Sequence, residues 1–169
     1  MKVGKNFVCI GEIEPFNRDW VTIGDDCLLG GQSKIILHGP IRPYKSNNKV
    51  VFEDLTWIGF RVLILPGTRI GRASLIGAAS VVFGDIPPYS IAVGNPVKVI
   101  KRREPYELLR WYTIRIKMDA VLGTVEPDFS LLTMQDVKYL FGHGTESPYD
   151  PSLDLDNMTV QDVLSYATK

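Results

Sequence analysis

Histidine and cysteine, the side chains that most often serve as general bases, nucleophiles or metal ligands, are scarce in this sequence. The chain contains two histidines, His38 and His143, and two cysteines, Cys9 and Cys27. Two cysteines are too few for a disulfide framework or a zinc cage. Chemistry that needs a single general base remains within reach, because one histidine can take a proton from an attacking hydroxyl or amine near neutral pH.

The two histidines stand in different surroundings. His38 lies in IILHGPIRP, where a regular pattern gives way to a loop, and His143 lies between glycines in the tail. His143 is expected to be exposed to solvent. From the residues alone, His38 is either a general base or a structural loop histidine, and the elements that position it must be considered.

Large apolar residues recur every six positions from residue 52 onward, and a small or short residue stands four places after most of them. This period matches neither the 3.6-residue repeat of an α-helix nor the simple alternation of a strand. Hexapeptide repeats are typical of a β-helix. The apolar positions are Phe52, Ile58, Ile64, Ile70, Ile76 and Val82, and the small positions are Thr56, Val62, Thr68, Ser74 and Ser80.

The same rule extends toward the N-terminus with two interruptions. Residues 23–35 repeat the pattern, after which a segment rich in proline, glycine and asparagine predicts a loop excursion over residues 38–51. Residues 1–22 are less regular and look like a degenerate first coil with an insertion between Pro15 and Trp20.

We therefore predict an all-β fold, a parallel β-helix, over residues 1–103. Each hexapeptide supplies one short strand and one corner, and three of them make a triangular coil of about 18 residues. The large apolar side chain points into the prism and stacks on its counterpart in the next coil. Each coil buries its apolar positions against its neighbours, so stability builds along the axis.

Residues 104–169 are predicted to form a separate, helical C-terminal extension and tail. An apolar face over residues 104–120 indicates a helix that caps the open end of the coils. Two later segments, residues 132–141 and 158–167, share a TxQDV pattern. Threonine followed three residues later by aspartate is close to a capping box, so the echo fits two helix starts, and a docking signal is the alternative.

Charge and hydropathy exclude several classes of protein. Nineteen basic and nineteen acidic residues cancel, so no long-range field selects nucleic acid or an anionic membrane. No apolar run approaches the roughly 18 residues of a membrane span, and the first residues lack the apolar core of a signal peptide. We expect a cytoplasmic protein with no nucleic-acid partner and no membrane span.

The segment over residues 52–103 resembles the hexapeptide-repeat O- and N-acetyltransferases, and in particular the xenobiotic and sugar acetyltransferase subgroups. The resemblance is carried by WIG, ILPG, IGAxSVV, DIPPYxI and GNPxKVI. It implies a left-handed β-helix, although parallel β crossovers are usually right-handed. It also implies a homotrimer that binds acetyl-CoA in the groove between neighbouring prisms and needs no metal.

The same resemblance implies roles for individual residues. A catalytic histidine is expected on the loop before WIG, where His38 stands, and it would take the proton of the acceptor. A backbone N–H near Gly59 is a candidate to stabilise the oxyanion. Small residues would let the pantetheine arm lie close to the backbone, and lysines would hold the phosphates. The implied acetyl-CoA contacts are Trp57, Gly59, Gly77, Ala78, Ala79, Lys98 and Lys101.

The acceptor is expected to be a small molecule with a hydroxyl or amine, of sugar or antibiotic type. Arg42 and Tyr44, in the loop excursion, are candidate acceptor contacts. A non-catalytic β-helix that serves as a scaffold or binds a partner is the alternative. A γ-type carbonic anhydrase, another β-helix, needs three histidines on zinc, and this chain has two.

Overall fold

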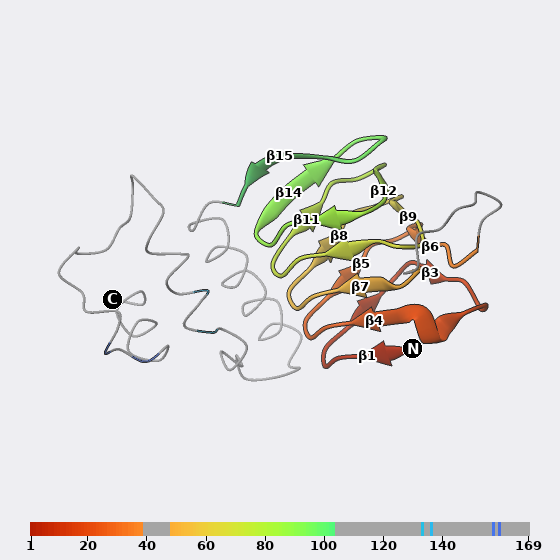
Figure 1. Cartoon of the computed structure of the whole chain (residues 1–169), viewed down its shortest axis with the longest axis horizontal. Helices are drawn as coiled ribbons and strands as arrows, with labels where there is room; N and C mark the ends of the chain where they lie inside the picture. The colour runs from red at the N-terminus through yellow and green to blue at the C-terminus, as the bar shows by residue number, and fades with distance from the viewer. Residues whose placement is uncertain (39–47, 104–132, 134–135, 137–156, 158, 160–169) are drawn as a thin grey trace. The chain divides into compact units, whose positions relative to one another are not determined.

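Short strands wind into a left-handed parallel β-helix whose three faces are sheets (Figure 1). The structure, a computed structural model, describes residues 1–38 and 48–103 and, farther along the chain, residues 133, 136, 157 and 159. The chain divides into two units, Met1–Arg103 and Glu104–Lys169. The β-helix belongs to the first unit.

The three sheets are called A, B and C, in the order in which each coil visits them. Sheet A contains β1 (Lys2–Val3), β4 (Val21–Ile23), β7 (Val50–Phe52), β10 (Arg69–Ile70) and β13 (Asp85–Ile86). Sheet B contains β2 (Val8–Cys9), β5 (Leu28–Leu29), β8 (Trp57–Ile58), β11 (Leu75–Ile76), β14 (Ser90–Val93) and β15 (Lys98–Arg102). Sheet C contains β3 (Glu12–Ile13), β6 (Lys34–Ile35), β9 (Leu63–Ile64) and β12 (Val81–Val82), and a 3-10 turn, η1 (Arg18–Trp20), precedes β4.

Between sheets the chain turns at three corners, which are named by the sheets they join. The A–B corner comprises residues 4–7, 24–27, 53–56, 71–74 and 87–89. The B–C corner comprises residues 10–11, 30–33, 59–62 and 77–80. The C–A corner comprises residues 14–20, 36–38, 48–49, 65–68 and 83–84.

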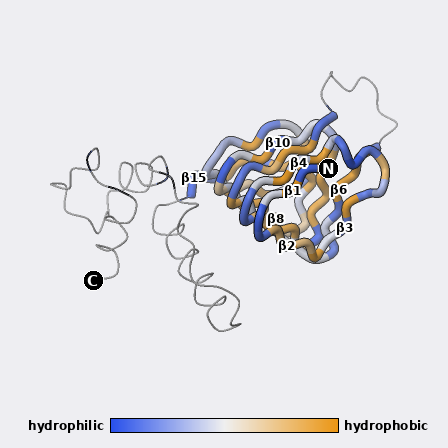
Figure 2. The backbone as a smooth tube through the Cα atoms, turned by 90° about the horizontal axis from the view of Figure 1, so that it is seen from below, coloured by the Kyte–Doolittle hydropathy of each residue, from blue (hydrophilic) through white to orange (hydrophobic). Residues whose placement is uncertain are grey.

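The hexapeptide register is confirmed by the stacking of the core. Equivalent residues of successive coils pair in parallel, as Trp57 with Leu75 and Ile58 with Ile76 do in sheet B. From the second coil onward the inward position of each parallel pair is buried and the outward one is not, and apolar and polar colours alternate along the tube (Figure 2). Each large aliphatic side chain buried in this way contributes about 1.5–3 kcal/mol. The inward residues are Ile23, Phe52, Ile70 and Ile86 in sheet A, Leu29, Ile58, Ile76 and Ala92 in sheet B, and Ile35, Ile64 and Val82 in sheet C.

The irregular N-terminus does form a coil. Strands β1, β2 and β3 pair with the second coil, and an insertion at residues 14–20 follows them. Strand β7 begins at Val50, so the loop excursion expected over residues 38–51 ends two residues earlier than predicted. The reason is that Val50 has its own parallel partner in sheet A, Val21, and its side chain is fully buried.

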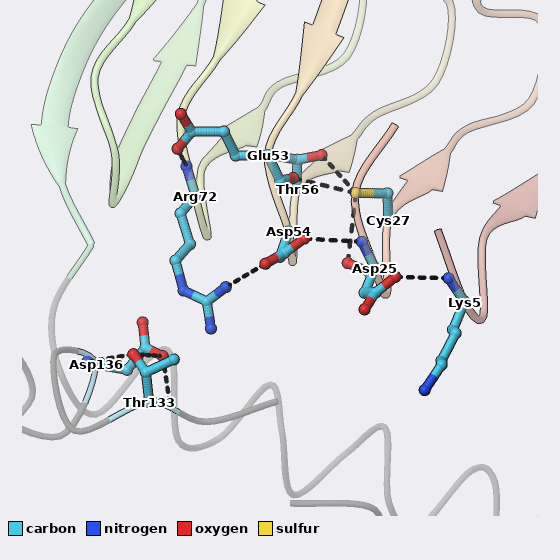
Figure 3. Close-up of polar contacts among 9 residues, drawn as sticks. All are labelled: Lys5, Asp25, Cys27, Glu53, Asp54, Thr56, Arg72, Thr133 and Asp136. Carbon is cyan, nitrogen blue, oxygen red and sulfur yellow. Dashed lines mark hydrogen bonds and ion pairs between the residues drawn. The ribbon is translucent and has the colours of Figure 1, made fainter. Parts of the chain in front are cut away.

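Carboxylates at the A–B corner link neighbouring coils, as Figure 3 shows. Asp25 accepts a hydrogen bond from the Lys5 backbone N–H at 2.6 Å, and Asp54 accepts one from the Asp25 backbone N–H at 2.9 Å. The guanidinium of Arg72 then donates to Asp54 at 2.7 Å. Because each carboxylate reaches the backbone of the coil before it, this ladder fastens the stack along its axis. Burial raises the pKa of the adjacent Cys27 thiol, which is typical of a structural cysteine.

The helix expected over residues 104–120 lies outside the described residues. Of the second unit's first TxQDV segment, Thr133 and Asp136 are described, and they make the predicted capping contacts. The Thr133 backbone N–H donates to the Asp136 carboxylate at 2.8 Å, and the Asp136 backbone N–H donates to the Thr133 hydroxyl at 3.3 Å. This reciprocal pair explains one TxQDV segment through helix-start chemistry.

Candidate functional site at the C–A corner

His38 is held by a buried carboxylate that the sequence analysis did not select. Its Nδ1 lies 2.6 Å from Oε2 of Glu14, and the same oxygen accepts the Leu37 backbone N–H at 2.9 Å. Glu14 is 5% exposed, whereas the His38 side chain is 65% exposed. The arrangement is therefore an exposed imidazole anchored at one nitrogen to a carboxylate below the surface.

Coil stacking brings the two residues together although 24 positions separate them. Strand β3 pairs with β6 in parallel, with Glu12 opposite Lys34. The chain therefore leaves both strands at the same corner, where Glu14 donates its backbone N–H to the Ile35 carbonyl at 3.2 Å. The insertion after β3 and the start of the loop excursion after β6 project from this corner of the prism (Figure 1).

The electrostatics favour an ionised Glu14. Burial by itself raises the pKa of this carboxyl. The hydrogen bond from the Leu37 N–H, the contact with His38 and the nearby Lys34 ammonium outweigh burial, and the pKa lies below its ordinary value. The ammonium lies 3.8 Å from Glu14 Oε1 and 3.3 Å from Glu12.

This charge arrangement selects a histidine tautomer. A carboxylate accepts hydrogen bonds and cannot donate them, so His38 places its proton on Nδ1 and its lone pair on Nε2. A histidine oriented in this way can accept a proton at Nε2, and the carboxylate then stabilises the imidazolium that forms.

The predicted acetyl-CoA residues gather at a different place from His38. Trp57, Leu75, Ile91 and Lys101 follow one another along the outward row of sheet B. Lys98 lies on the same edge strand, β15, and is exposed. The remaining four residues lie on the neighbouring B–C corner, and they are Gly59, Gly77, Ala78 and Ala79. Sheet C separates this corner from the C–A corner that carries His38.

The corner glycines have a reason in the packing of the coils. A Cβ built on Gly59 would lie 2.8 Å from the Ile76 carbonyl oxygen, and one on Gly77 would collide with Val93. The Gly59 backbone N–H already donates to the Ile76 carbonyl at 2.8 Å, because it belongs to the ladder between coils. The idea that this N–H holds an oxyanion is therefore wrong, and these glycines do not by themselves indicate a ligand.

Arg42, Tyr44 and His143 lie outside the described residues. Within residues 1–38 and 48–103, no group of three or more His, Cys, Asp and Glu side chains is placed to hold a metal ion. Of the helices in the described part of the chain, none has the length and apolarity needed to cross a membrane.

Glu14 is the functional candidate that sequence reasoning missed. It falls in the insertion where the hexapeptide rule fails, so no repeat position marks it. The one sequence signal was a carboxylate placed directly after the sheet C strand one coil before His38. Using it requires the number of residues between equivalent positions of the two coils, and the insertion changes that number.

Comparison with known proteins finds acetyltransferases. No family model matches the chain. A protein of Schizosaccharomyces pombe, provisionally named an acetyltransferase, is 37% identical over 91 residues, which is 50% of this chain and 44% of that protein. A Mycobacterium tuberculosis protein, also provisionally named an acetyltransferase, is 46% identical over 105 residues, which is 60% of this chain and 31% of that protein. The chain thus spans less than half the length of these relatives.

Solved structures of acetyltransferases share the fold. The polySia-specific acetyltransferase NeuO superposes with a TM-score of 0.51 at 25% identity, over 59% of this chain and 50% of that one. A serine acetyltransferase of Neisseria gonorrhoeae gives a TM-score of 0.51 at 24% identity, over 64% of this chain and 41% of that one, which supports the fold alone. The coils of this chain are therefore similar, in sequence and in fold, to acetyltransferases, and the resemblance to the hexapeptide-repeat acetyltransferases is confirmed.

Proposed function

We propose that this chain transfers an acetyl group from acetyl-CoA to a hydroxyl or amine of a small acceptor, of sugar or antibiotic type, with His38 as the general base. The observation that carries the proposal is the 2.6 Å contact between His38 Nδ1 and the buried Glu14 carboxylate. It supplies what acetyl transfer requires of the protein, a base held in one tautomer and open to a substrate. The similarity to acetyltransferases supplies the reaction class.

In this mechanism the acceptor oxygen or nitrogen attacks the thioester carbonyl carbon as its proton moves to His38 Nε2. The tetrahedral intermediate collapses, the carbon–sulfur bond breaks, and the coenzyme A thiolate takes the proton from His38. Glu14 stays ionised throughout and stabilises the imidazolium, which makes it a positioning residue. No serine or cysteine nucleophile is required, because the thioester is already activated.

The two halves of the proposed site support a homotrimer. His38 stands on the C–A corner, and the proposed acetyl-CoA contacts stand on the B–C corner and the outer row of sheet B. Because sheet C lies between these corners, a site that uses both takes His38 from one prism and the acetyl-CoA contacts from a neighbouring copy. We propose that the groove between two copies is the active site.

The outer row of sheet B is suited to such an interface. Its residues Leu28, Trp57, Leu75 and Ile91 are apolar, outward-facing and partly buried. The equivalent row of sheet A is polar or short, with Thr22, Val51, Arg69 and Asp85. An apolar ladder on one face, rimmed by lysines, has the composition of an association surface.

The decisive experiment measures coenzyme A release with a thiol reagent in the presence of acetyl-CoA and a panel of sugars and amino sugars. His38→Ala should lower kcat by a factor of about 10²–10⁴ and leave the KM for acetyl-CoA unchanged. A His38→Ala protein that turned over at the wild-type rate would refute the assignment of the base.

Donor binding is tested separately by thermal unfolding with coenzyme A. At about 100 times Kd the ligand should stabilise the protein by about 2.7 kcal/mol. The Lys98→Ala/Lys101→Ala double variant should lose this effect, and a Lys2→Ala/Lys5→Ala control, which removes the same charge from the first coil, should keep it. If coenzyme A stabilises none of these proteins, the β-helix is a scaffold and the proposed enzyme is rejected.

Acetyl-CoA is a cytoplasmic metabolite, so the cytoplasm remains the predicted location.

A further inference from the structure

One glycine on the B–C corner has no explanation in the packing or the backbone of the coils. Most of the described glycines stand where a Cβ would lie within 3.0 Å of a neighbouring atom, and they are Gly4, Gly11, Gly24, Gly30, Gly59, Gly71 and Gly77. Three others adopt a positive φ, and they are Gly67, Gly84 and Gly94. Among the described glycines, Gly31 alone has neither reason, because its φ is not positive and a Cβ would have no contact shorter than 3.5 Å beyond its chain neighbours. An alanine would fit there, so the glycine leaves space on the surface.

That space is an apolar notch between two exposed side chains. A carbon atom at the Cβ position of Gly31 would lie 3.5 Å from Cγ2 of Ile10, in the coil before, and 3.5 Å from Cδ2 of Phe60, in the coil after. Ile10 is 64% exposed and Phe60 is 46% exposed. Both distances are ordinary van der Waals contacts, so one methyl or methylene group fills the space and touches both walls. We call this space the Gly31 notch.

The wall formed by Phe60 is held in place. The guanidinium carbon of Arg61 lies 5.2 Å from the centroid of the Phe60 ring, and Arg61 Nε donates to Gln32 Oε1 at 2.7 Å. The Arg61 backbone N–H also donates to the Gly31 carbonyl at 3.0 Å. Because these contacts order the corner before a ligand arrives, a ligand that packs in the notch loses less entropy on binding.

The notch lies at the level where the proposed donor ends. Sheet B runs in the order β15, β14, β11, β8 and β5, so four strand spacings of about 4.8 Å separate Lys98 and Lys101 from the second coil (Figure 1). Gly31 and His38 both belong to this second coil. In a trimer whose threefold axis is parallel to the prisms, rotation keeps each residue at its level, so His38 of one copy faces the level of Gly31 in the next. A donor with its phosphates at the lysines and its thioester at His38 directs its acyl group to the notch.

We propose that the Gly31 notch binds the acyl chain of the donor and admits one carbon more than acetyl, so that propionyl-CoA is a substrate. The inference rests on the proposed function. The carbon–sulfur bond breaks, the propionyl carbonyl carbon bonds to the acceptor oxygen or nitrogen, and the acceptor proton passes through His38 to the coenzyme A thiolate. The added carbon leaves water for the contact with Ile10 and Phe60.

The test measures dissociation constants by isothermal titration calorimetry with coenzyme A, acetyl-CoA and propionyl-CoA, so it needs no acceptor. The wild-type protein should bind propionyl-CoA about fourfold more tightly than acetyl-CoA, which is the gain from burying one methylene group. Gly31→Ala fills the notch, so it should weaken propionyl-CoA about tenfold and leave the affinity for coenzyme A unchanged. Ile10→Ala removes one wall and should abolish the preference for propionyl-CoA over acetyl-CoA.

Gly84→Ala is the matched control, because it adds the same methyl group at another corner, where nothing lies within 4 Å of it. It should keep the wild-type ratio of the two dissociation constants. Gly31→Ala should unfold in urea as the wild-type protein does, since its Cβ meets only ordinary contacts. The acyl site is refuted if the wild-type protein does not prefer propionyl-CoA, if Gly31→Ala leaves that preference intact, or if Gly84→Ala removes it equally. Absence of coenzyme A binding in the wild-type protein would instead reject the proposed function, and the acyl site with it.

Discussion

Replacing Glu14 by glutamine tests the proposed mechanism most directly, because it removes one charge and keeps the size of the side chain. The amide carbonyl oxygen of the introduced glutamine can still accept the Leu37 N–H, so the corner should keep its conformation. The same oxygen faces His38 Nδ1 at 2.6 Å, so what is lost there is the negative charge that strengthens this hydrogen bond and stabilises the imidazolium. A hydrogen bond to a charged group is worth about 1.5–3 kcal/mol.

If that energy is lost from the transition state, kcat falls by a factor of roughly 10–150, since each 1.36 kcal/mol is one factor of ten. The KM for acetyl-CoA should not change, because Glu14 lies at a different corner from the proposed donor contacts. The assay is coenzyme A release under saturating donor and acceptor, with circular dichroism melting to confirm that the variant is folded.

The double variant Glu14→Gln/His38→Ala provides the matched comparison. If Glu14 acts through His38, the double variant should be no slower than His38→Ala alone, because residues that act as a unit are not additive. Should Glu14→Gln keep full activity while His38→Ala loses it, the imidazole needs no carboxylate and the reasoning from the contact fails.

Three further predictions concern stability, each measured by urea unfolding. The folded state lowers the pKa of Glu14, so its stabilisation is present above the ordinary pKa of 4.5 and the advantage of wild type over Glu14→Gln should shrink as pH falls below it. Asp54→Ala should cost about 1 kcal/mol, because its half-exposed carboxylate bridges coils, whereas Asp85→Ala, on an exposed outward position, should cost almost nothing. Gly30→Ala should lower the free energy of unfolding by up to about 3 kcal/mol, since its Cβ would lie 2.6 Å from a backbone carbonyl oxygen. Gly84→Ala, where φ is +83° and the Cβ would meet open space, should lower it by about 1 kcal/mol. Equal losses for the two variants would contradict the packing argument.

The periodic part of the fold could be predicted closely from the sequence. Ile58, Ile64, Ile70 and Ile76 are six residues apart, and all four are fully buried on successive faces of the prism, so that Ile76 stacks on Ile58 one coil later. Prediction failed where the period failed. Val50 resumed the sheet earlier than expected, because a parallel partner one coil below is not visible in the linear order.

The candidate site likewise has one residue that the sequence pattern could predict and one that it could not. His38 could be proposed as the base from its place at the end of a repeat and from the resemblance to acetyltransferases. Its partner could not, because Glu14 stands in an irregular insertion whose length sets which residue meets His38.

What the sequence by itself determined is therefore the repeating architecture, since burial of one apolar side chain in every six is a local rule that each coil obeys. Tertiary structure alone decided which residues meet across coils. Stacking placed Glu14 against His38, and it put the proposed donor contacts on another corner. Such contacts depend on how many residues separate equivalent positions of two coils. Every insertion between the coils changes that number, and neither contacting residue shows it in the sequence.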